Sequence, residues 1–233
     1  MTRLYQVLFY MILRKNKLIF LLPSKVGSTS FSNMIKESGI EYELCSTLKH
    51  PFISELLQCK KLEDFYNYSI IQLCRNPIDR LVSAYFFQRQ LIKDKEKYKK
   101  FLDLDFNSFV KLIAENVKHL PDHTKKFCFN VFDDMNFSTR MAPTSYGVRF
   151  YLPQVRWNDM GMKVKYLKLE DLKKNVKYAY QVLGDDIKLI FPESNITKNK
   201  TSKLYIEMYS KESLEIVKEI YKEDFKILNY DTP

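Results

Sequence analysis

The sequence of 233 residues has few of the residue types that mark metal and disulfide sites. Its four cysteines form no Cys-x-x-Cys pair, so their pattern demands neither disulfides nor a cysteine zinc site. Two of its three histidines, His119 and His123, flank Pro121 and therefore cannot share a regular helical face as zinc ligands would. No metal site is predicted.

Long hydrophobic runs are also absent. The apolar stretch from Leu4 to Leu13 has ten residues, whereas a helix needs about 20 to span a bilayer. No small-residue cleavage site follows it. We expect the N-terminal apolar segment, residues 1–15, to pack on the domain as a helix or strand, with weak contact to a membrane surface as the alternative. The protein is expected to be cytoplasmic.

Glycine is scarce, with five residues, and no Walker A loop is present. The chain has instead a short apolar run, Leu18 to Leu22, then the loop Pro23-Ser24-Lys25-Val26-Gly27-Ser28-Thr29-Ser30, then helical periodicity from Phe31. This order predicts a buried strand, a tight loop and a helix. Backbone N–H groups and the dipole at such a helix start attract an anion. The loop is a candidate phosphate cradle, although a serine-rich helix cap without a ligand has the same pattern.

Several loop residues have properties that suit a phosphate site. Gly27 allows the backbone to approach a phosphate closely, and Lys25 supplies a cation at the mouth of the loop. Hydroxyl groups follow directly after the glycine. The candidate binding residues are Lys25, Val26, Gly27, Ser28, Thr29 and Ser30.

The composition indicates one packed domain, residues 1–233, with an anionic partner. Hydrophobic residues make up 45% and aromatic residues 15% of the chain, which favours a globule over a disordered chain. The 38 Lys+Arg exceed the 28 Asp+Glu and give a formal charge of +10. Such an excess favours nucleotides, nucleic acids, acidic glycans or membrane surfaces, without choosing between them, and is also compatible with a merely solvated basic surface.

A second motif follows the next predicted buried strand, Tyr68 to Cys74. Arg75 ends this strand, where ligands of open α/β sheets collect, and Pro77 opens a helix. Ser83 lies about two turns into that helix and can face the same crevice. A guanidinium and a hydroxyl together suit a phosphate dianion. The alternative is that Arg75 pairs with Asp79 and that Ser83 is an ordinary helix residue.

Local periodicity predicts further elements. Alternating strands and helices indicate an α/β fold with a mainly parallel sheet flanked by helices. The predicted elements are a strand over Ile40–Leu44, a helix over Leu102–Val117 entered near Asn107, a strand over Lys163–Leu169, a helix over Leu172–Leu183 and a closing helix over about Lys211–Phe225.

The two motifs together resemble a known family. Residues 23–30, Pro-Ser-Lys-Val-Gly-Ser-Thr-Ser, resemble the 5′-phosphosulfate loop of sulfotransferases. Residues 75–85, Arg-Asn-Pro-Ile-Asp-Arg-Leu-Val-Ser-Ala-Tyr, resemble their 3′-phosphate motif. In order and spacing the pair is similar to that of the carbohydrate sulfotransferases of sulfotransferase family 2, which include chondroitin and heparan sulfate 2-O enzymes and bacterial relatives. The resemblance extends over nearly the whole chain and implies a P-loop-kinase-like sulfotransferase fold.

The resemblance also implies a reaction. A sulfuryl group would pass from 3′-phosphoadenosine 5′-phosphosulfate (PAPS) to a hydroxyl, expected to be that of a carbohydrate, by in-line displacement without a metal. Lys25 would stabilise the charge on the leaving phosphate. Arg75 and Ser83 would hold the 3′-phosphate, and Lys200 or Lys203 of a basic loop would close over the nucleotide.

His50 is the candidate catalytic base. The segment Lys49-His50-Pro51, followed by an apolar helix, resembles the segment in which relatives carry a histidine that is the base in the heparan sulfate 2-O branch. A neutral imidazole is suited to take the proton of the acceptor hydroxyl, with Glu55 or another carboxylate as the fallback. Residues 93–149 are expected to be a variable acceptor-binding region. Acceptor-site candidates beside it are Arg149, Gln154, Arg156 and Trp157, with loop packing as their alternative role.

Two other functional classes remain open from the sequence. A nucleotide or small-molecule kinase of P-loop-like fold would share the strand, loop and helix, but would depend on ATP and Mg²⁺. A non-catalytic basic module that binds acidic glycan or nucleic acid would explain the charge, but would not need a 3′-phosphate pocket. With the sulfotransferase interpretation, no nucleic acid partner is expected.

Overall fold

A computed structural model describes residues 10–43, 51–60, 65–91, 96, 99–118, 151–171 and 205–233. These residues form two compact units. The first comprises the described residues within 10–75 and 156–171, and the second those within 76–155 and 205–233. Within the described ranges, no helix has the length and apolar character needed to cross a membrane.

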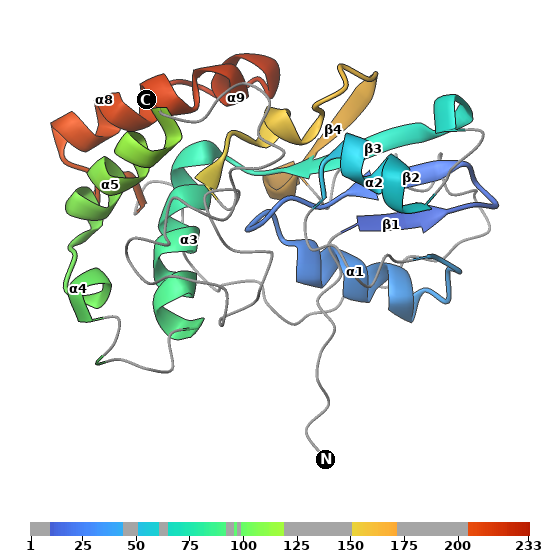
Figure 1. Cartoon of the computed structure of the whole chain (residues 1–233), viewed down its shortest axis with the longest axis horizontal. Coiled ribbons are helices and arrows are strands. Elements are labelled where there is room, and N and C mark those ends of the chain that lie inside the picture. The colour runs from blue at the N-terminus through green and yellow to red at the C-terminus, as the bar shows by residue number, and fades with distance from the viewer. Residues whose placement is uncertain are drawn as a thin grey trace. The chain divides into compact units, whose positions relative to one another are not determined.

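The first unit is built on a four-stranded sheet with the order β1-β2-β3-β4 (Figure 1). The strands are β1 (Tyr10–Leu13), β2 (Leu18–Leu21), β3 (Ser69–Cys74) and β4 (Val164–Lys168). Strand β1 pairs with β2 in antiparallel fashion, whereas β2, β3 and β4 are parallel. The predicted mainly parallel sheet is therefore confirmed. Part of the N-terminal apolar segment forms β1, and residues 1–9 lie outside the described residues.

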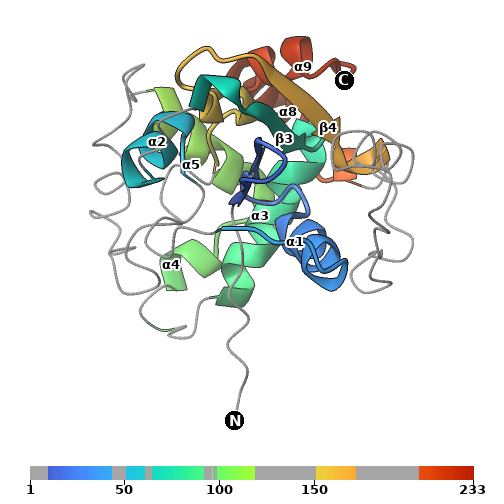
Figure 2. The ribbon, with the colours of Figure 1, turned by 90° about the vertical axis from the view of Figure 1, so that its right-hand side faces the viewer.

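Both faces of this sheet are buried. Side chains alternate between the two faces along each strand, so apolar residues of the same strands pack into two separate core clusters. Helix α1 (Ser28–Glu37) covers one face and α2 (Ile53–Lys60) the other (Figure 2). The face under α1 contains Met11, Leu13, Leu18, Phe20, Ile71, Leu73 and Leu167. The face under α2 contains Tyr10, Ile12, Ile19, Leu21 and Ile70, and Phe65 of the 3₁₀ helix η1 (Phe65–Asn67) joins it. Cys74 is buried as a free thiol.

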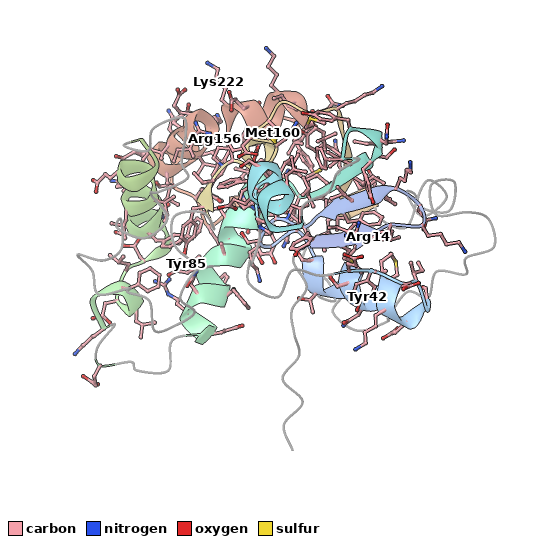
Figure 3. All side chains as sticks on the ribbon, turned by 45° about the vertical axis from the view of Figure 1, so that its right-hand side comes forward. Arg14, Tyr42, Tyr85, Arg156, Met160 and Lys222 are labelled. Atoms are coloured by element: carbon pink, nitrogen blue, oxygen red, sulfur yellow. The ribbon has the colours of Figure 1, made fainter. Side chains whose placement is uncertain are left out.

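The prediction of a strand over Ile40–Leu44 is wrong for the described part of that segment. Glu43 makes only an isolated antiparallel bridge to Ile12. The side chains of Ile40 and Tyr42 pack on the core cluster under α1 instead of continuing the sheet. Arg14 forms an ion pair with Glu43 at this edge (Arg14 and Tyr42 are labelled in Figure 3). The alternation of apolar and acidic residues from Ile40 to Glu43 thus reflects a half-buried segment beside β1, and not a further hydrogen-bonded strand of the sheet.

The second unit contains helices from distant parts of the chain. They are α3 (Pro77–Leu91), α4 (Lys99–Leu102), α5 (Phe106–Lys118), α8 (Lys211–Ile220) and α9 (Lys222–Ile227). Tyr85 of α3 packs edge-on against Phe106 and Phe109 of α5, with ring centroids 5.2 and 5.1 Å away (Figure 3). Helix α3 begins at the predicted proline. Helix α5 begins near the predicted entry because Asp105 accepts a hydrogen bond from the Ser108 N–H at 2.9 Å.

The prediction of one closing helix is also corrected. Helices α8 and α9 are separated at Tyr221, whose backbone has φ −104° and ψ 21°. The buried Tyr221 hydroxyl donates to the carbonyl oxygen of Tyr151 at 2.7 Å. The apolar periodicity continues across this break through Val217, Tyr221 and Phe225, all buried, which is why the sequence indicates a single helix.

Asp224 of α9 binds the segment around Gln154 through hydrogen bonds within the second unit. Its carboxylate accepts hydrogen bonds from the N–H groups of Gln154 (2.8 Å) and Val155 (3.0 Å). Arg80 is also buried and donates to the carbonyl oxygen of Leu152 at 2.9 Å. Burial raises the pKa of Asp224, while the charge of Arg80 and these hydrogen bonds oppose that rise. This polar network connects α3, the 152–155 segment and α9.

Replacing this buried carboxylate is expected to destabilise the protein strongly. Asp224→Ala removes the acceptor of two buried N–H groups and leaves the Arg80 charge without its neighbour, at a cost of about 3–5 kcal/mol. Asp224→Asn keeps one acceptor oxygen and should cost less. The measurement is urea unfolding, with Glu223→Ala on the exposed side of α9 as the control, expected within about 0.5 kcal/mol of wild type. Equal unfolding midpoints for the two alanine variants would contradict this role of Asp224.

Candidate functional site

The candidate site lies where the three parallel strands of the first unit end. Strand β2 leads into the loop at residues 22–27, β3 into Arg75, and β4 into Leu169. Because carboxyl ends of parallel strands meet at one edge of a sheet, these segments are neighbours there. The structure thus brings together the loop and Arg75, as the sequence predicts.

The loop enters α1 through two residues with left-handed backbone conformation. Lys25 has φ 64° and Gly27, the N-cap of α1, has φ 81°. Glycine adopts this conformation readily, whereas a lysine there carries strain. The N-cap position of α1 is occupied by Gly27, which makes no side-chain capping hydrogen bond, and not by one of the neighbouring serine and threonine residues. A glycine N-cap places backbone rather than a capping side chain at the helix start, an arrangement that suits anion binding at helix termini.

The other loop residues have distinct positions. Val26 is fully buried in the core under α1, so only its backbone can contribute to binding. Ser28 is buried as well, and its hydroxyl donates to the carbonyl oxygen of Pro23 at 2.8 Å, which closes the loop. Thr29 is exposed and Ser30 is half-buried. The roles assigned to these residues in binding a phosphate stay predictions.

Lys25 and Arg75 form a pair of cations at this edge. Burial and, as the smaller cause, the charge of Arg75 together lower the pKa of Lys25 to about 8. Both effects disfavour the charged amine, and a bound anion would reverse the balance by favouring it. Two half-buried cations beside a helix start are an arrangement suited to a polyanionic ligand.

Gly27 is in close contact with Leu169, a residue that the sequence motifs do not single out. A Cβ atom at position 27 would lie 2.6 Å from Leu169 Cδ1. Alanine is therefore disfavoured there by the positive φ, and its Cβ would also require the end of the Leu169 side chain to shift. The only sequence signal for Leu169 is its place as the last residue of the predicted strand Lys163–Leu169.

Ser83, the second predicted residue for a 3′-phosphate, belongs to the second unit. It is half-buried on α3. Its motif neighbours Asp79 and Arg80 are buried, so their charged groups form part of the interior of the second unit. The predicted role of Ser83 stays a prediction.

The remaining candidates fall into two groups. His50, Lys200, Lys203, Arg149 and most of the expected acceptor-binding region 93–149 lie outside the described residues. The fallback base Glu55 lies in the first turn of α2, where its carboxylate accepts from the Phe52 N–H at 2.9 Å. Gln154 and Trp157 are buried and take part in packing, whereas Arg156 is half-buried. No group of side chains suited to a metal ion occurs among the described residues.

The pKa of Lys25 can be measured directly. After reductive ¹³C-methylation, the NMR signal that disappears in Lys25→Ala is expected to titrate near pH 8. Arg75→Ala should raise this pKa, but not to the ordinary lysine value, because burial is the larger cause. Arg75→Lys keeps the charge and should keep the pKa low. The Lys25 amine keeps its proton to a higher pH in the unfolded chain than in the folded protein, because folding lowers its pKa. Its contribution to the free energy of unfolding therefore increases as the pH rises from about 8 to the ordinary lysine range. A Lys25 signal that titrates like an exposed lysine would contradict the burial of the amine.

The comparison with protein families is consistent with this geometry. The sulfotransferase family matches residues 9–231, which includes the sheet, the loop at residues 22–27, Arg75 and the helices of both units. A search of curated proteins finds no significant match. Because the family match covers nearly the whole sequence, the chain belongs to the sulfotransferase family.

Proposed function

We propose that the protein transfers a sulfuryl group from PAPS to a hydroxyl of a carbohydrate acceptor. Family membership supports sulfuryl transfer in general. The observation that carries the choice of donor is the pairing of Lys25 and Arg75 beside the glycine loop, since PAPS presents two separate phosphate groups to one site. The carbohydrate acceptor is proposed from the resemblance of the two motifs and from the basic charge of the chain.

The loop is proposed to hold the 5′ end of the donor. The N–H groups of Gly27, Ser28 and Thr29 bind the 5′-phosphate, with the hydroxyl groups of the first turn of α1 assisting. Arg75 binds the 3′-phosphate together with Ser83. Lys200 or Lys203 closes over the nucleotide. A 3′-phosphate contact distinguishes this donor from ATP.

Transfer then requires a cation on one side of the sulfur and a base on the other. The acceptor oxygen attacks sulfur as the bond between sulfur and the bridging oxygen breaks, and that electron pair stays on the phosphate of the desulfated product, PAP. Protonated Lys25 stabilises this charge. His50 takes the acceptor proton as its oxygen forms the new bond. The bound donor raises the pKa of Lys25 above about 8 and thereby keeps the amine charged.

The donor site is tested by calorimetric titration with PAP and with AMP. PAP should bind wild type more than about 10-fold more tightly than AMP, because only PAP offers the 3′-phosphate. Arg75→Ala should weaken PAP binding by at least about 10-fold and leave AMP binding less affected. Arg14→Ala is the matched control: Arg14 follows β1 at the opposite edge of the sheet, where it pairs with Glu43.

The possible outcomes separate the functional classes. If PAP and AMP bind equally, the 3′-phosphate pocket is excluded and a kinase or a basic binding module is favoured. Binding that requires ATP with Mg²⁺ selects the kinase. Loss of PAP binding in Arg14→Ala equal to that in Arg75→Ala would indicate a non-specific effect of surface charge.

The proposed base is tested by His50→Ala. Turnover with PAPS and an acceptor should fall by at least about 100-fold, whereas PAP affinity should stay within a factor of about two, because the base acts on the acceptor and not on the donor. His119→Ala, a histidine to which the sequence assigns no role, serves as the control. Near-normal turnover in His50→Ala would remove His50 from the mechanism.

A further inference from the structure

Leu169 reaches the loop from the far side of the central strand. It follows β4 and begins the 3₁₀ helix η4 (Leu169–Asp171). The loop follows β2, and β3 lies between these two strands. The Leu169 side chain nevertheless fills the space beside the Gly27 Cα, since a Cβ there would meet Cδ1 at 2.6 Å and Cδ2 at 3.4 Å. The contact thus joins the ends of two strands that are not hydrogen-bonded to each other.

This contact completes a set of three restraints on the loop. The side chain of Val26 is buried in the core under α1 and anchors the loop there. The hydrogen bond from Ser28 Oγ to Pro23 O closes it at its base. The side chain of Leu169 packs on Gly27 and is the third restraint. The Gly27 carbonyl oxygen also accepts from the Phe31 N–H at 3.0 Å, and Leu169 adds side-chain packing at this residue, whose type occupies many backbone conformations at little cost.

We propose that Leu169 is a positioning residue of the sulfotransferase site, which packs on Gly27 and so fixes the loop backbone that presents Lys25 and the first N–H groups of α1. Anion sites built from backbone N–H groups depend on fixed directions, and small displacements weaken them severely. The proposal rests on the proposed function for the identity of the ligand, but the contact itself acts in the protein without donor. Leu169 would touch no reacting atom and would act through Gly27.

The proposal predicts a specific pattern in a double-mutant cycle. Gly27→Ala places a Cβ against Leu169 and forces alanine into a positive φ, so it should lose PAP affinity and melting temperature. Leu169→Ala frees the loop and should weaken PAP binding by about 10-fold. In the double variant the clash is gone and only the backbone strain remains. The double variant should therefore bind PAP more tightly and melt at a higher temperature than Gly27→Ala alone.

Hydrogen exchange provides the readout that general destabilisation would not give. In Leu169→Ala, amide exchange at residues 25–28 should become at least about 10-fold faster, while exchange in β3 stays unchanged. The pKa of Lys25 should rise as water gains access to the loop. Val164→Ala is the matched control, because Val164 is half-buried and apolar like Leu169 but is the first residue of β4 and packs on the core under α2. It should leave loop exchange and PAP binding unchanged.

The outcomes separate this proposal from the proposed function. If wild type does not bind PAP, the proposed function fails, while the exchange rates and melting temperatures still test the contact. Unchanged exchange at residues 25–28 in Leu169→Ala, or purely additive effects in the double variant, would overturn the positioning role. Should Leu169→Ala fail to fold, Leu169→Val shortens the side chain by one methylene, and a faster exchange confined to the loop would be the supporting result.

Discussion

The site depends on an electrostatic constraint: Lys25 and Arg75 are held together where burial already disfavours charge. The pKa of Lys25 falls to about 8 mainly through burial and further through its guanidinium neighbour. Such a pair is costly in a folded protein, and surface lysines normally avoid it by turning into water. Here one cation follows β2 and the other follows β3, and because the two strands are joined in parallel register both cations lie at the same edge of the sheet. The constraint favours a polyanion as the occupant of this edge.

The sheet can impose this constraint because it is buried on both faces. Helices α1 and α2 cover opposite faces of the short strands, and their apolar residues alternate between two separate core clusters. A register shift of one residue would exchange these clusters, so the register is strongly fixed. The loop inherits this rigidity through Val26, which belongs to the cluster under α1. Core packing and the proposed anion site are therefore coupled through one loop.

The sequence predicted correctly those elements that a single local pattern is enough to identify. The apolar runs at Leu18 and Ile70 indicate buried strands, and Pro77 marks a helix start, so the loop and Arg75 could be placed at a sheet edge without a structure. The contact of Leu169 with Gly27 could not be predicted, because it depends on the order of strands in the sheet and leaves no local pattern. The break at Tyr221 was missed for a related reason. Its apolar period continues unchanged, whereas the hydrogen bonds of Tyr221 and Asp224 at the break are tertiary contacts that leave no local pattern.

The backbone at Lys25 shows that the loop is not optimised for stability alone. A residue with φ 64° is most easily a glycine, and a lysine in this conformation costs about 1 kcal/mol or more. The same residue also carries a charge that burial disfavours. A glycine at position 25 would relieve both penalties and would keep the left-handed turn, but it would remove the amine from the mouth of the loop. Strain and desolvation thus fall on the same residue, which is the pattern expected where a side chain is kept for the chemistry of a ligand.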